Sequence, residues 1–313
     1  MNKYNTSKTL AYIGLSIMSL IIGLSFIFVK IGLKFSDPVD LLSYRFSSAF
    51  IILVVLYGLG LIKICDISWK KIKQLLLLSI FYPLFFFFFQ AWGMQYSSSS
   101  EAGIIFAITP VVTSIVARYF LKEKVNTTQI IGILLSVVGI IYIIFHKIDF
   151  RSYTQNIQGI LFLILSVLSM VTYYILGKKL INGFSAMDIT IGMTFVGFIF
   201  FNSWSIINHT SADTMNDFTS LLFNTEFIWA ILYLGILSSF LTSFLSNFAL
   251  QIIPAYQISI FNNLNPIIAV VGGVIFLKEK LYSYHIIGGI LVLMGVMLTL
   301  IFKPKPKIEN DES

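Results

Sequence analysis

Charge is scarce in this sequence. Of the 313 residues, 11% are Asp, Glu, Lys or Arg, whereas 57% are hydrophobic. A water-soluble domain averages about 25% charged residues, because it needs them to cover its surface. So little charge excludes a soluble enzyme, a disordered chain and a secreted disulfide scaffold. We therefore expect lipid to surround most of this chain, in agreement with its mean hydropathy of +0.90.

Cysteine is almost absent, and acidic residues are missing from the middle of the apolar runs. Cys65 is the only cysteine, which excludes intramolecular disulfides and zinc or iron–sulfur sites built on several cysteines. Glu101 and Glu226 come at the starts of expected helices, where a carboxylate suits the helix dipole. A proton-driven pump places an ionisable group in its membrane path. No such group is evident here, so facilitated diffusion or exchange stays open.

Long apolar runs fill most of the chain. A membrane-spanning helix needs roughly 20 mostly apolar residues. We count ten such runs and predict an all-α integral membrane protein with ten transmembrane helices. The approximate limits of these runs are 10–33, 39–62, 73–96, 101–120, 128–146, 157–177, 186–208, 226–249, 254–277 and 283–302.

Lysine and arginine are distributed unevenly among the predicted loops. If the N-terminus is inside, 14 of the 21 basic residues fall on the inner side and 7 on the outer side. The positive-inside rule then predicts a multi-pass protein of the cell membrane with both termini in the cytoplasm. We interpret the net charge of +7 as this topogenic charge, and not as a nucleic-acid surface.

The sequence repeats itself after a shift of 156 residues. The segments Phe120–Lys124 and Phe276–Lys280 both read FLKEK, and residues 107–140 have 11 identities in 34 positions without a gap. Shared apolar composition does not explain a block with three charges, so we infer a duplicated five-helix unit. Because five is odd, the second unit enters the membrane inverted, as in many secondary transporters. We predict repeats over 1–147 and 148–303 and a disordered cytoplasmic tail over 304–313.

One pattern of residues occurs in both halves. The first half carries it as Gln90–Tyr96, Ala102, Pro110, Phe120–Glu123, Gly132 and Gly139. The second half carries it as Ala249, Leu250, Ala255, Pro266, Phe276–Glu279, Gly288 and Gly295. Over essentially the whole chain, the sequence resembles the drug/metabolite transporter superfamily, in its ten-helix EamA-type branch. The resemblance implies a secondary transporter that exports small organic solutes, such as amino acids or related metabolites, by alternating access.

Polar and aromatic residues near the middle of the spans are the candidate binding site. In hydrocarbon such groups need partners, so each either contacts the substrate or joins helices by hydrogen bonds. Pro110 and Pro266 are expected inside their helices as hinges or kinks, with a static kink as the alternative. Substrate contact is predicted for Gln90, Trp92, Thr109, Tyr173, Tyr174, Asn247, Gln251, Asn262 and Asn265.

The remaining charged and aromatic residues of the spans are not counted among the predicted substrate contacts. The run Phe85–Phe89 covers every face of a helix, so we assign it no binding role. Lys30 and Arg45 are the charges nearest to a span interior. They either extend to the membrane interface or attract an anionic group of the substrate, such as a carboxylate. Glu123 and Glu279 are expected to pair or cap at the interface.

Other classes of function fit the sequence less well. A membrane-embedded enzyme needs a positioned acid, base or metal, but His146, His209 and His285 lie far apart at span ends. We therefore expect no enzymatic activity, no metal and no cofactor. A facilitative channel-like pore and a non-transporting membrane scaffold are the alternatives. The expected partners are membrane lipids and a small-molecule substrate but no nucleic acid, and the protein is expected to be a monomer or homodimer.

Overall fold

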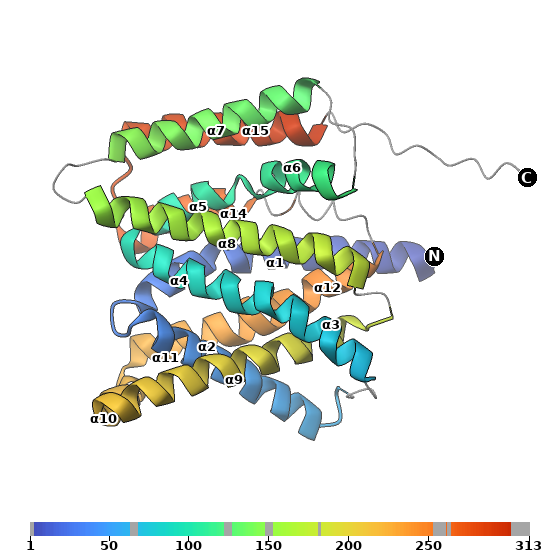
Figure 1. Ribbon diagram of the computed structural model, residues 1–313, viewed down its shortest axis with the longest axis vertical. Helices are drawn as coiled ribbons and strands as arrows, with labels where there is room; N and C mark the ends of the chain where they lie inside the picture. The colour runs from blue at the N-terminus through green and yellow to red at the C-terminus, as the bar shows by residue number, and fades with distance from the viewer. Residues whose placement is uncertain are drawn as a thin grey trace, which may run out of the picture.

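Long helices make up the computed structural model, which describes residues 3–62, 68–121, 127–147, 153–180, 183–252, 261 and 264–301. They run in roughly the same direction across the view, and no strand occurs among the described residues (Figure 1). The first helices are α1 (Lys3–Gly32), α2 (Pro38–Gly58), α3 (Trp69–Ser79), η1 (Ile80–Phe85), α4 (Phe86–Tyr96), α5 (Ser99–Phe106), α6 (Thr109–Leu121) and α7 (Thr127–Lys147). The later ones are α8 (Tyr153–Leu180), α9 (Ala186–Ala212), α10 (Met215–Ser220), η2 (Leu221–Phe223), α11 (Thr225–Leu232), η3 (Tyr233–Leu241), α12 (Thr242–Ile252), α14 (Leu264–Leu277) and α15 (Ser283–Ile301).

Among the described residues, six helical stretches are long and apolar enough to cross a membrane. They are Lys8–Gly32, Pro38–Gly58, Trp69–Tyr96, Ile157–Gly177, Ala186–Ala212 and Thr225–Ala249. Four shorter apolar helices in the described part of the chain are Ser99–Thr113, Ile130–Ile143, Leu264–Leu277 and Ser283–Leu298. The predicted all-α membrane fold is confirmed, whereas the count of ten spans stays a prediction.

The outside of the bundle is covered by large apolar side chains. Ile51, Phe145 and Trp229 are 61%, 71% and 66% exposed, and similar residues occur on most of the long helices. Extended apolar surface of this kind is rare on soluble monomers and marks contact with another apolar phase. This surface therefore suits surrounding lipid.

Two of the long helices depart from regular α-helix near their middle. In the first, η1 joins α3 to α4 at a kink, because Tyr82 has non-helical dihedral angles (φ −141°, ψ 115°). In the second, the π-helical segment η3 joins α11 to α12. A shift of 156 residues carries 80–85 onto 236–241, which lies within η3. A π-helical segment inside an α-helix, as at η3, is frequent at functional sites. Both segments also contribute to the cavity described below.

Small residues bring α7 and α15 together, and these helices lie side by side at the top of Figure 1. A Cβ added at Gly139 would lie 2.8 Å from the carbonyl oxygen of Gly288, and one added at Gly295 would collide with the carbonyl oxygen of Gly132. Such close approach of two backbones requires glycine. The 156-residue shift relates these two contacts to each other.

We expect Gly295→Leu to lower the stability of the protein by about 1–3 kcal/mol, because the added side chain meets backbone that cannot move aside. Thermal unfolding of the detergent-purified protein, followed by tryptophan fluorescence, measures the loss. Gly58→Leu is the matched control, since a Cβ at Gly58 meets nothing within 4 Å. Equal losses in the two variants would contradict close packing at Gly295.

Candidate functional site

A cavity lies in the middle of the bundle, among α1, α2, α4, α5, α6, α8, α12 and α14 and the segments η1 and η3. The space open to the centre of a water-sized sphere is about 90 Å³, which holds several water molecules. Aromatic rings and uncharged polar groups form most of its wall. A small amphipathic solute is the kind of ligand that such a wall can surround.

Seven of the residues predicted for the site line this cavity. They come from α4, α6, α8, α12 and α14, so the fold brings together segments that are far apart in the sequence. The seven are Gln90, Thr109, Tyr173, Tyr174, Asn247, Asn265 and Pro266.

The other four predicted residues are placed differently. Trp92 is not among the lining residues; its ring stacks on Phe88, with 4.3 Å between centroids, and lies 6.0 Å from Trp204. Pro110 is buried but does not line the cavity. The side chain of Gln251 and the whole of Asn262 lie outside the described residues.

Both prolines lie in the first turn of a helix, and not in a helix interior. Pro110 is the second residue of α6, and Pro266 is the third residue of α14. Proline cannot donate to the carbonyl four residues before it. For Pro110 that carbonyl belongs to Phe106, which instead accepts a hydrogen bond from Thr109 Oγ1 (2.6 Å). The chain therefore satisfies this carbonyl itself, and the N-terminal end of α6 meets the cavity at Thr109.

The three cavity amides have different surroundings. Asn247 joins helices, because its Oδ1 accepts from the Tyr173 hydroxyl (3.4 Å) and its Nδ2 donates to Thr190 Oγ1 (3.2 Å). Gln90 is buried and makes no hydrogen bond through its amide to any described residue. Asn265 is also buried, and its Oδ1 has no hydrogen-bond partner in the described part of the chain. A buried acceptor without a partner costs about 1–3 kcal/mol, so Asn265 is suited to bind a donor from a solute.

Two phenylalanines from the run without an assigned role line the cavity. Phe86 and Phe87 are buried and face it, whereas Phe85 is 45% exposed. Periodicity carries no information in a run of identical residues, so the sequence could not distinguish these faces. The cavity also contains Tyr82, whose hydroxyl lies 3.3 Å from Ser243 Oγ and so connects η1 to α12.

Arg45 is buried in the wall of the cavity, with 2% of its surface exposed. Its Nε donates to Ser239 Oγ (2.7 Å) and a terminal nitrogen donates to Ser238 Oγ (3.1 Å). Its guanidinium carbon lies 4.0 Å from the centre of the Phe87 ring. No carboxylate of a described residue pairs with it. The interpretation that Arg45 extends to the membrane interface is therefore wrong.

Lys30 has a different role from Arg45. Its Nζ donates to the carbonyl oxygen of Met94 (2.8 Å), which lies in the last turn of α4. Carbonyls at that position have no partner within their own helix, and a cation there also suits the helix dipole. Lys30 is not among the residues that line the cavity.

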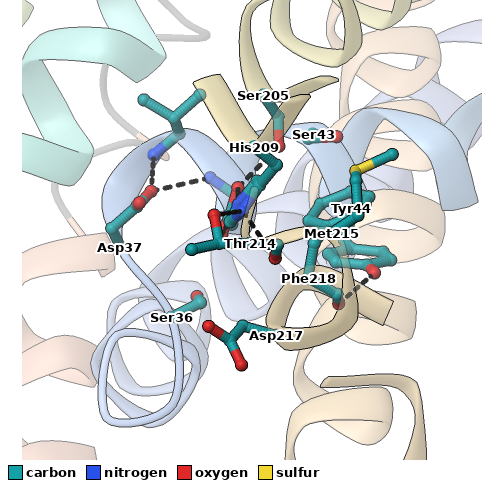
Figure 2. Close-up of polar contacts among 12 residues, drawn as sticks. Ser36, Asp37, Ser43, Tyr44, Ser205, His209, Thr214, Met215, Asp217 and Phe218 are labelled. Atoms are coloured by element: carbon teal, nitrogen blue, oxygen red, sulfur yellow. Dashed lines mark hydrogen bonds and ion pairs between the residues drawn. The ribbon is translucent and has the colours of Figure 1, made fainter. Parts of the chain in front are cut away.

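A polar cluster at the end of the bundle near α10 joins α2 to α9 (Figure 2). The buried carboxylate of Asp40 accepts from Ser205 Oγ (2.6 Å) and from His209 Nε2 (2.9 Å). The other ring nitrogen of His209, Nδ1, lies 2.7 Å from Thr214 Oγ1. Asp37, just before α2, accepts from the backbone nitrogens of the first turn and caps the helix. These contacts fix the position of the first turn of α2.

The next turn of α2 is fixed as well. The Tyr44 hydroxyl donates to the carbonyl oxygen of Phe218 (2.7 Å), and the two rings stack with 4.6 Å between centroids (Figure 2). Farther along the helix, Ser48 Oγ donates to the carbonyl oxygen of Ile231 (2.9 Å). Because Arg45 lies between these two contacts, they set the depth and the rotation at which it enters the cavity.

Acidic residues also join the ends of other helices. Glu279, just after α14, accepts from the backbone nitrogens of Ser99 (2.8 Å) and Ser100 (3.0 Å) at the start of α5. The predicted capping role of Glu279 is confirmed, and Glu123 lies outside the described residues. Glu101 lies 3.3 Å from His285 Nε2.

Within the described ranges, no three His, Cys, Asp or Glu side chains gather into a metal-binding group.

Comparison with known proteins identifies the family. The model of the EamA-like transporter family matches residues 9–145 and 157–301. The chain belongs to the EamA-like transporter family. The uncharacterized transporter YcxC of Bacillus subtilis (strain 168) is 40% identical over 291 residues, which cover 93% of this chain and 92% of that protein. An uncharacterized transporter of Archaeoglobus fulgidus is 26% identical over 278 residues, or 89% of this chain and 94% of its own.

A solved structure supports the same architecture. A crystal structure described only as that of a protein superposes with a TM-score of 0.61 and 12% sequence identity, over 97% of this chain and 100% of that chain. At that identity the likeness concerns the fold alone. Membership in the EamA-like family and the apolar helices establish a multi-pass membrane transporter, as the resemblance predicts. This favours transport over catalysis.

Proposed function

We propose that this EamA-like transporter exports small organic solutes, such as amino acids or related metabolites, by alternating access. The observation that carries the proposal is the central cavity, in which the buried amides of Gln90 and Asn265 lie among aromatic rings. A channel needs a continuous water-filled path, whereas a small site that surrounds its ligand suits a carrier that binds one solute per cycle. Solute gradients supply the driving force, through facilitated diffusion or exchange.

We propose further that the chain forms two inverted five-helix repeats, over 1–147 and 148–303, with ten spans in total. The matching sequence blocks, the paired glycine contacts of α7 and α15, and the corresponding places of η1 and η3 support this symmetry. The cavity takes residues from both halves, as alternating access between two inverted units requires. Movement of one half against the other then opens the site to each side in turn.

The proposed setting is the cell membrane, with both termini in the cytoplasm. The start of α1 and the end of α15 lie at the same end of the bundle, which supports termini on one side (Figure 1). Membrane lipids and a small-molecule substrate are the proposed partners, without nucleic acid. The transporter is proposed to act as a monomer or homodimer.

A flux measurement tests the proposed function. Liposomes containing the purified protein are loaded with a mixture of amino acids and metabolites, and mass spectrometry records which solutes leave, with and without a pH gradient. We expect selective loss of a few related solutes, saturation with concentration, and faster loss when the same solutes are present outside. Flux that neither saturates nor responds to external solute would indicate a pore. No selective loss from correctly inserted protein would contradict transport of these solutes.

A further inference from the structure

We infer that the cavity binds the carboxylate of a zwitterionic solute at Arg45 and the amino group near Asn265. The inference rests on the proposed function, because it names the substrate class of the same cavity. Its substrates are amino acids or similar amino carboxylates. Solutes in which the carboxylate is neutralised or absent are transported at least about tenfold more slowly.

The surroundings of Arg45 are those of a group that needs an anion. A guanidinium has five N–H donors in a planar fork, and a buried cation without a counter-ion is strongly unfavourable. Two serine hydroxyls accept from Arg45, and the face of Phe87 contacts it. A carboxylate accepts two parallel hydrogen bonds from this fork and neutralises the charge. A carboxylate is therefore the partner that the described residues do not supply.

The charge of the cavity favours a single carboxylate over a doubly charged group. Arg45 is the only charged residue among the described residues that line the cavity. One carboxylate balances the single positive charge of Arg45, whereas a phosphate monoester with close to two negative charges exceeds it. The ammonium group of the zwitterion keeps its own positive charge, so its partners in the cavity are uncharged acceptors. The N-terminal end of α6 at Thr109 adds a weaker positive potential, as half-helices do in other transporters.

The repeat does not supply a second cation. A shift of 148 residues aligns Asp40 with Asp188 at the start of the second helix of each half, and it carries Arg45 onto Met193. The anion site therefore belongs to the first half alone. The second half contributes Asn265, whose buried Oδ1 has no partner among the described residues. An acceptor of this kind suits an ammonium group, and aromatic rings such as those in the cavity wall attract a cation as well.

The proposed ligand then spans the interface between the halves. Its carboxylate contacts α2 of the first half, and its amino group contacts α14 of the second half. The aromatic wall is left to contact the side chain, which favours apolar or aromatic amino acids. A solute held by both halves stabilises the arrangement in which they close around it.

The experiment uses matched acid and amide probes in the wild-type protein. Proteoliposomes are loaded with equal concentrations of L-phenylalanine, L-leucine and L-threonine, or with the corresponding amides, and the loss is corrected for protein-free liposomes. We expect each exported acid to leave at least about tenfold faster than its amide, because a hydrogen-bonded charge pair is lost. Acid and amide leaving at equal rates would overturn the inference. The inference would also be overturned if neither the acids nor the amides leave while other solutes are exported. No export of any solute would overturn the proposed function itself.

Variants connect the acid preference to Arg45. Arg45→Gln is expected to bring the acid-to-amide ratio close to one, whereas Arg45→Lys, which keeps the charge, is expected to retain part of it. Lys30→Gln is the matched control, because Lys30 is a cation near a span interior that does not line the cavity. Its acid-to-amide ratio should equal that of the wild type. If Arg45→Gln keeps the acid-to-amide ratio of the wild type, Arg45 does not bind the carboxylate. The wild-type comparison does not depend on the folding of any variant.

Discussion

His209→Leu is expected to lower the free energy of unfolding by about 3–5 kcal/mol, because it leaves the buried carboxylate of Asp40 without its cationic or N–H partner. The remaining side-chain partner of that carboxylate is the Ser205 hydroxyl. One hydroxyl does not replace the hydration that the carboxylate loses on burial. Unfolding of the detergent-purified protein, followed by tryptophan fluorescence over temperature or denaturant, measures the change.

Two controls separate this effect from general damage. Asp217→Asn changes an exposed acid in the neighbouring α10 and should alter stability by less than about 0.5 kcal/mol. The double variant Asp40→Leu with His209→Leu should be more stable than His209→Leu alone, since no buried charge then remains. If the double variant loses as much unfolding free energy as Asp40→Leu and His209→Leu lose together, the interaction between Asp40 and His209 does not stabilise the cluster.

The cluster also has a consequence for function, because α2 carries both Asp40 and Arg45. Asp40 and Tyr44 hold the start of α2 against α9 and α10, and Ser48 holds its middle against α11. Gly235 lets η3 come close, since a Cβ there would collide with Ser48 and lie 2.9 Å from the nitrogen of Ala49. This close packing brings Ser238 and Ser239 to the guanidinium.

Sequence patterns predict the spans and several cavity residues for clear physical reasons. Apolar runs of membrane length identify the helices, and an amide in such a run must find a polar partner. That argument identified Gln90 and Asn265, which line the cavity. It could not separate them from Asn247, which joins helices, because the partners of Asn247 come from distant segments.

The burial of Arg45 depends on contacts that hydropathy does not describe. Its distance from the start of α2 suggests a position near the membrane interface. However, α9 continues to Ala212, and α10 and η2 fold beside it, so protein covers this end of α2. Hydropathy also does not show which aromatic side chains face the cavity. Trp92 stacks with Phe88 and Trp204 outside the cavity, in a run where every neighbour is also apolar.

Asn265→Leu is expected to reduce transport by about 10- to 100-fold without lowering stability. A hydrogen bond to a charged group contributes about 1.5–3 kcal/mol, which corresponds to this loss when the solute's amino group has no acceptor. In the free protein the substitution removes a buried oxygen without a partner, which favours the folded state. Flux per correctly folded molecule and the unfolding midpoint are measured on the same preparation.

Asn202→Leu is the matched control, because Asn202 is an amide in another span with complete hydrogen bonding. Its Oδ1 accepts from Ser43 (2.8 Å) and Ser47 (3.0 Å), and its Nδ2 donates to the carbonyl oxygen of Phe198 (2.9 Å). Its loss should lower stability and leave the flux per correctly folded molecule unchanged, the opposite of the result expected for Asn265. If both variants lose stability and transport together, Asn265 joins helices as Asn202 does, and the amino group of the solute binds elsewhere in the cavity.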